Sequence, residues 1–186
     1  MLGPLGARGV LGPLTGGRPS VASGPEDVIW EALVNCSADG NTLTKTGLVD
    51  GWDAGAISSR GILSGEGYVE FSLAETTTRR MCGLSKGNTG AGFGEIDFAF
   101  YPAPGAIYVF ENGSQKGGSF GTYNPGDVLR VSVEAGAVTY RKNGDLLYTS
   151  LTAPDYPLLV DSSLRSPGAT ITSAVLFGSN LGDNGV

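Results

Sequence analysis

Short runs in which apolar and polar residues alternate limit most strongly how this chain can fold. The clearest run spans residues 95–101 and reads EIDFAFY. In an extended backbone it places Ile96, Phe98 and Phe100 on one face. The opposite face would then carry Glu95, Asp97, Ala99 and Tyr101. Similar alternation recurs over residues 69–73, 129–133 and 171–177. This period of two predicts half-buried β-strands.

Turn residues separate these runs. Asn143-Gly144 lies between the strand-like segments 138–142 and 146–149, which is a strong hairpin signal. Asn124-Pro125-Gly126-Asp127 predicts a second tight turn, because Pro presets φ and Gly accepts a positive φ. Further apolar runs are expected as strands at 107–110 and, as a strand or a short helix, at 28–34. Many short strands joined by turns favour two packed sheets.

The segments 67–101 and 124–150 together resemble the SPRY-like branch of concanavalin-like β-sandwiches, which recur in phage and bacterial surface proteins. The second segment reads NPGDVLRVSVEAGAVTYRKNGDLLYTS. The resemblance runs from about Val28 to Gly178. It implies an all-β fold, an antiparallel two-sheet jelly-roll sandwich, which we assign to residues 26–186.

Residues 1–25 differ in composition and are expected to form a separate, extended Gly/Pro-rich N-terminal arm. Leu-Gly-Pro-Leu occurs at 2–5 and again at 11–14, and the frequent Pro and Gly disfavour a helix. One interpretation is a flexible tail. The other is an assembly arm that docks on a partner through its apolar residues and prolines, which are Leu2, Pro4, Leu5, Val10, Leu11, Pro13 and Leu14.

Charge and hydropathy exclude some partners. The net charge is −6, but residues 1–24 carry +2 and the remainder holds 10 basic and 18 acidic residues, or 10 − 18 = −8. An acidic body argues against nucleic acid. The sequence contains no apolar run long enough for a membrane helix, so membrane insertion is not expected. The first residues lack the features of a signal peptide, and we expect synthesis in the cytoplasm without one.

Catalysis and cofactors are not expected. The chain contains no His, which removes Ser-His-Asp and Cys-His chemistry. The resemblance implies one further test, because concanavalin-like glucanases carry a Glu-x-Asp strand that ends in a second Glu. Here Ala99 or Phe100 occupies that place. No D-x-D-x-D-G loop is present, so no metal is predicted. Gly87 to Gly94 lacks the Lys-Ser/Thr ending of a phosphate loop and indicates a surface loop.

A candidate ligand face consists of Glu95, Asp97 and Tyr101, because carboxylates beside an aromatic ring orient sugar hydroxyls. Solvated strand carboxylates are the alternative. Trp52 and Tyr68 are either stacking platforms or core residues. Cys36 and Cys82 either form one disulfide or remain free thiols.

The leading hypothesis is a non-catalytic structural protein of a phage virion, a decoration or fibre component. Its arm would dock on other virion or assembly proteins and on sister subunits, outside the cell. The alternative is a carbohydrate-binding, lectin-like module that recognises surface glycans. A glucanase-like enzyme is the weakest of the three hypotheses.

Overall fold

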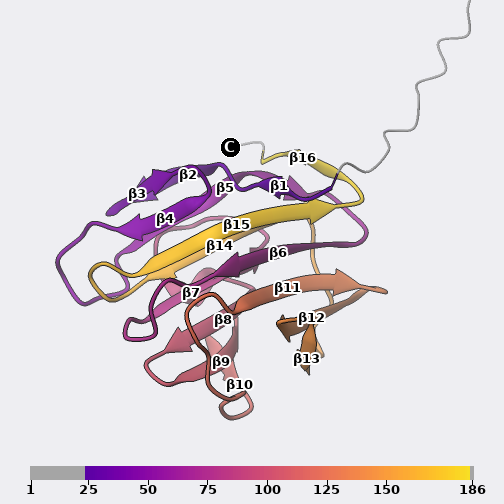
Figure 1. Cartoon of the computed structure of the whole chain (residues 1–186). Helices are drawn as coiled ribbons and strands as arrows, with labels where there is room; N and C mark the ends of the chain where they lie inside the picture. The colour runs from indigo at the N-terminus through magenta and orange to yellow at the C-terminus, as the bar shows by residue number, and fades with distance from the viewer. Residues whose placement is uncertain (1–23, 185–186) are drawn as a thin grey trace, which may run out of the picture.

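A computed structural model describes residues 24–184 as two antiparallel β-sheets packed face to face (Figure 1). Sheet A has the order β13-β12-β11-β6-β15-β4-β3, and β1 also pairs with β15. Its strands are β1 (Glu26–Asp27), β3 (Cys36–Asp39), β4 (Thr42–Lys45), β6 (Gly67–Ser72), β11 (Val128–Glu134), β12 (Ala137–Lys142), β13 (Asp145–Thr149) and β15 (Thr170–Gly178).

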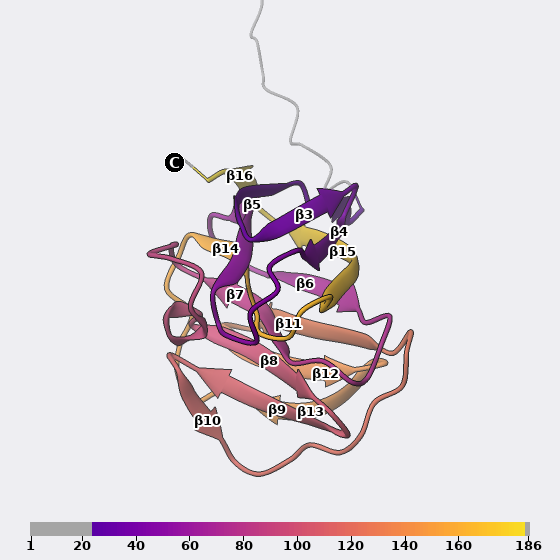
Figure 2. The same ribbon diagram turned by 90° about the vertical axis from the view of Figure 1, so that its left-hand side faces the viewer.

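Sheet B has the order β10-β9-β8-β7-β14-β5-β16, and β2 also pairs with β5. Its strands are β2 (Trp30–Val34), β5 (Ala54–Ile62), β7 (Arg80–Ser85), β8 (Phe98–Ala103), β9 (Ala106–Glu111), β10 (Ser114–Lys116), β14 (Leu158–Leu164) and β16 (Leu181–Asp183). One 3₁₀ turn, η1 (Phe93–Glu95), precedes β8. Figure 2 turns the molecule so that β7, β8 and β9 of this sheet face the viewer.

The core lies between the sheets and comes from the alternation read in the sequence. In β11, Leu129, Val131 and Val133 are buried, and β6 adds Val69 and Phe71 from the neighbouring strand. Sheet B contributes its own inward side chains to the same cluster, among them Leu84, Phe98, Phe100, Leu158 and Val160. The two apolar faces exclude water from each other, which is the main stabilising contribution in a sandwich of this kind.

The expected turns are present. β12 and β13 form the hairpin around Asn143-Gly144, where both residues have positive φ, at 51° and 89°. In the turn at 124–127, the Asp127 N–H donates to Asn124 O at 3.1 Å and Gly126 has a φ of 87°. These features confirm the predicted all-β, two-sheet sandwich.

One expectation needs correction. The strand predicted from Glu95 begins only at Phe98, because residues 93–95 form η1. Ile96 consequently packs with Met81 and Ala99 on the outer face of sheet B and not with Phe98 and Phe100. Of the two structures expected for residues 28–34, a strand or a short helix, the strand is present as β2. The run at 171–177 forms the expected strand, β15, which lies inside sheet A between β6 and β4.

Residues 1–23 and 185–186 lie outside the described part of the chain. The seven arm residues predicted above all fall there. The division into an arm of residues 1–25 and a body of residues 26–186 therefore stays a prediction.

Candidate functional site

A glycine-rich loop, residues 86–95, crosses the outer face of sheet B between β7 and β8. Two carboxylates hold it. Glu95 accepts hydrogen bonds from the N–H and hydroxyl of Thr89 and, at 2.8 Å, from the Gly90 N–H. Asp97 accepts one from the Lys86 N–H at 2.7 Å. The two acids of the predicted ligand face thus fix the shape of this loop, which projects beside β7 and β14 in Figure 2.

The loop is also attached to the sheet beneath it. Ser163 on β14 donates its hydroxyl to Ala91 O at 2.7 Å, and Ser85 on β7 donates to Glu95 O at 3.1 Å. Gly55 on β5 leaves the room for this approach, since a Cβ there would lie 3.6 Å from the Ala91 Cα and closer still to the carbonyl of Ser162. The loop is therefore a fixed part of this face.

Asp161 lies on β14 below this loop and is only 2% exposed. Burial raises the pKa of its carboxyl well above the ordinary value, and the nearby charges of Glu95 and Asp97 raise it further. Its Oδ2 atom has no hydrogen-bond partner among the described residues. Sequence reasoning missed this residue. The available signal was a single acid directly after the apolar residues Leu158, Leu159 and Val160.

Beside the loop, five aromatic rings cover the outer face of sheet B. The rings of Trp52 and Phe93 have centroids 4.9 Å apart, and those of Trp52 and Tyr101 are 5.5 Å apart. Phe110 meets Tyr101 edge-on at 5.3 Å, and Tyr108 lies 5.8 Å from Tyr101. All five rings are half-buried, so each keeps some surface in contact with solvent. We call them the aromatic platform.

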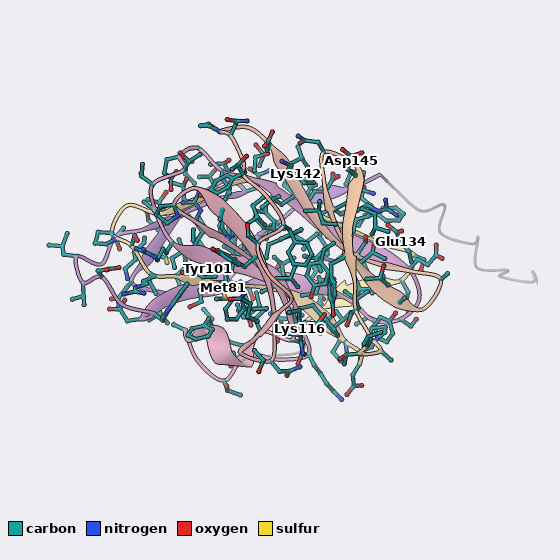
Figure 3. The ribbon with its side chains drawn as sticks, turned by 90° about the horizontal axis from the view of Figure 1, so that it is seen from below. Met81, Tyr101, Lys116, Glu134, Lys142 and Asp145 are labelled. Carbon is teal, nitrogen blue, oxygen red and sulfur yellow. The ribbon has the colours of Figure 1, made fainter. Side chains whose placement is uncertain are left out.

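Buried Met81, Ile96 and Ala99 support the platform from the sheet. Figure 3 shows Tyr101 and Met81 near one another beside the helical turn η1, away from Glu134, Lys142 and Asp145. Within residues 24–184, no side-chain hydrogen bond is formed by the Trp52 indole or by the hydroxyls of Tyr101 and Tyr108. The platform thus combines apolar ring surface with unused polar atoms.

Two hollows adjoin the loop. One has a volume of about 440 Å³ and is lined by Thr89, Gly90, Gly92, Gly94 and Glu95. The other is a cavity of about 230 Å³ on the far side of the loop, lined by residues 32, 34, 55, 56 and 88–91. Thr89 and Gly90 line both hollows. Loop-lined hollows on a rigid sheet are where such scaffolds carry binding sites.

The predicted candidates are thus only partly brought together. Tyr101 and Trp52 belong to the platform, whereas Glu95 and Asp97 bind the loop backbone. Tyr68 lies on the other sheet, where its ring stacks on Phe177 at 5.3 Å.

Both cysteines are free thiols. Cys82 is a core residue, and burial raises the pKa of the Cys36 thiol to about 11.

Among residues 24–184, no group of three or more His, Cys, Asp or Glu side chains is arranged to hold a metal ion. The same residues include no helix that is long and apolar enough to span a membrane.

No protein-family model matches the sequence, and no curated protein does either. Solved structures do match. A human SPRY domain aligns with a TM-score of 0.62 at 19% identity, over 79% of this chain and 97% of that domain. The Emp47p carbohydrate recognition domain aligns with a TM-score of 0.51 at 7% identity, over 80% of this chain and 87% of that one.

The fold is that of a SPRY-like, concanavalin-like β-sandwich. A sialidase chain contains the same fold, with a TM-score of 0.51 at 11% identity over 84% of this chain and only 16% of the sialidase. Identities this low show a shared fold and nothing beyond it.

Proposed function

We propose that this protein is a non-catalytic carbohydrate-binding module whose ligand lies on the aromatic platform, next to the loop of residues 86–95. The observation that carries the proposal is the platform itself. Sugar rings present apolar C–H faces that pack on aromatic rings, while their hydroxyl groups need polar partners at the rim. Half-buried rings with unused N–H and O–H groups match both requirements.

The loop supplies the rim. Phe93 belongs to both the loop and the platform, so polar groups of the loop lie next to the rings. Because Glu95 and Asp97 already hold the loop backbone, we assign them a positioning role and not direct contact with the sugar. The Emp47p carbohydrate recognition domain has the same fold, so the fold is compatible with this class of ligand.

Hydrolysis is not part of the proposal. Each carboxylate beside the platform is engaged with loop N–H groups, and Asp161 is covered by the loop. The equivalent places for a second strand carboxylate hold Ala99 and Phe100, which are both buried. The module would therefore bind a glycan without cleaving it.

The experiment is a glycan-array screen of the wild type, followed by calorimetric titration with the best binder. Trp52→Ala and Tyr101→Ala should each weaken binding by about tenfold or more, because each removes ring surface that the sugar covers. Tyr68→Ala is the matched control, since it removes a similar ring from the outer face of sheet A.

Thermal unfolding of all three variants separates lost binding from lost folding. If the wild type binds no glycan on the array, or if Tyr68→Ala weakens binding as much as Trp52→Ala, the platform is not a sugar site.

The virion hypothesis remains a prediction. It depends on residues 1–23, outside the described part of the chain, and the solved structures named above are a SPRY domain, a carbohydrate recognition domain and a sialidase. Virion partners, sister subunits and an extracellular location likewise stay predictions.

A further inference from the structure

An apolar patch lies on strand β2 of sheet B and on the loop that precedes β5. Its members are Leu33, Val34, Leu48 and Val49, which are 44%, 44%, 90% and 65% exposed. Asn35 ties the two segments together, because its carbonyl accepts from the N–H groups of Thr46 and Gly47 and its amide donates to Asp53 O at 2.8 Å. We call these four residues the β2 edge patch. Exposed apolar clusters of this kind usually mark a contact surface.

The backbone beside the patch is open as well. Among the described residues, β2 pairs with β5 alone, so its second edge carries unpaired N–H and C=O groups. A bulge between Glu31 and Val34 removes Ala32 and Leu33 from the ladder, and Ala32 has a φ of 51°. The cavity of about 230 Å³ opens next to it, between Ala32, Val34 and the loop residues 88–91. An edge strand left in this state is a template for another extended segment.

We propose that this surface is covered by the N-terminal arm of the same chain, residues 1–23, through its two Leu-Gly-Pro-Leu units. The arm joins the body at Gly24, and only Val28 and Ile29 separate β1 from β2. At roughly 3.3 Å per extended residue, 23 residues reach about 75 Å, which is more than enough to return to β2.

Chemistry favours the same occupant. The arm offers Leu2, Leu5, Leu11 and Leu14 to an apolar surface, and prolines that favour extended backbone lower the entropy lost on docking. Its Arg8 and Arg18 carry the charge opposite to the net −8 of the remainder of the chain, as counted above. Glu31 on β2 is exposed, and among the described residues it forms no ion pair and accepts only from Asn184 at 3.2 Å. A cationic, leucine-bearing segment matches both properties.

The patch could bind the arm of its own chain or the arm of a second copy, and the covalent link to the body favours the chain's own arm. A segment tethered next to its own binding surface has an effective concentration on the order of millimolar, above the concentration of free copies in most solutions. The arm of the same chain therefore occupies the patch first. Exchange of arms between copies is the competing outcome.

Hydrogen exchange of the full chain tests the proposal. In the wild type, amides of residues 30–35 and 47–50 should exchange at least about tenfold more slowly than in Leu5→Ser/Leu14→Ser. The control, Leu146→Ser/Leu151→Ser, removes two exposed leucines, one on the edge strand β13 of sheet A and one just after it, and should leave the exchange of both segments unchanged. Sedimentation at several protein concentrations gives the mass in parallel.

Slow exchange that persists at low concentration in a monomer supports the proposal. Equal exchange in wild type and arm variant overturns it. Protection that appears only together with a dimer also overturns it, since the arm of a second copy would then be the occupant.

Discussion

The outer faces of both sheets consist of antiparallel strands. They differ in whether their polar side chains bind one another. On sheet A, charged side chains pair across neighbouring strands: Arg130 meets Glu70 at 2.6 Å and Arg141 meets Glu134 at 2.8 Å. On sheet B, aromatic rings and a fixed loop cover the surface, and several polar atoms stay without a partner.

This difference separates a solvated surface from a binding surface. A face whose charges satisfy one another gains little by contacting a ligand, because those pairs would first have to be broken or desolvated. When a ligand binds to half-buried rings with unused N–H and O–H groups, no existing pair has to be broken, and new contacts and hydrogen bonds form. The comparison therefore directs attention to sheet B, although the acidic and aromatic residues are spread over both sheets.

The largest expected effect concerns the close approach of β7 and β8 under the platform. A Cβ at Gly83 would lie 2.8 Å from both the Ala99 Cα and the Phe98 carbonyl carbon, and closer still to the Phe98 oxygen. Backbone atoms cannot move aside as a flexible side chain can. Gly83→Ala should lower the free energy of unfolding by about 3 kcal/mol or more, measured by chemical denaturation.

Gly87→Ala is the control for that change, because a Cβ there meets no atom within 4 Å. Its stability should remain close to that of the wild type. A Gly83→Ala protein with wild-type stability would mean that β7 and β8 are farther apart than described, and the support of the platform would need revision.

The second prediction concerns the buried acid of sheet B. Because the pKa of Asp161 is raised in the folded state, the folded protein keeps a proton that the unfolded chain releases above its pKa of about 3.9. Stability from this group is thus complete below that pH and declines as pH rises. Asp161→Asn should stabilise the protein at pH 7 by about 1 kcal/mol, or roughly 2–4 °C in Tm.

The gain should shrink towards pH 4, which denaturation at the two pH values measures. Asp145→Asn removes the same charge from an exposed position on sheet A and controls for the change in net charge. A destabilised Asp161→Asn protein at pH 7 would show that the ionised carboxylate has a partner that the folded chain needs.

Local sequence signals predicted the sandwich well and the site only in part. The alternation in β6 and β11 and the turn at Asn143-Gly144 depend only on residues that are close together in the sequence. They can therefore be predicted from it. The spacing of Glu95 and Asp97 predicts a strand, but residues 93–95 form a 3₁₀ turn, and the two carboxylates bind the backbone of Thr89, Gly90 and Lys86. Phe93 and Phe110 joined the platform through contacts between distant segments, which no local pattern contains.

The smallest effect is expected from the ion pair on the outer face of sheet A. Arg130 pairs with Glu70, and its guanidinium carbon lies 3.9 Å from the centre of the Tyr68 ring, yet about a third of the Arg130 side chain is exposed to solvent. Solvent screens such a pair, so Arg130→Met should cost only about 0.5–1 kcal/mol, and less at high salt. A double-mutant cycle with Glu70→Gln measures the part that belongs to the pair.

Glycan affinity should not change in either variant, because the platform lies on the other sheet. Loss of glycan binding in Arg130→Met would contradict the assignment of the ligand site to sheet B and would indicate a site on sheet A.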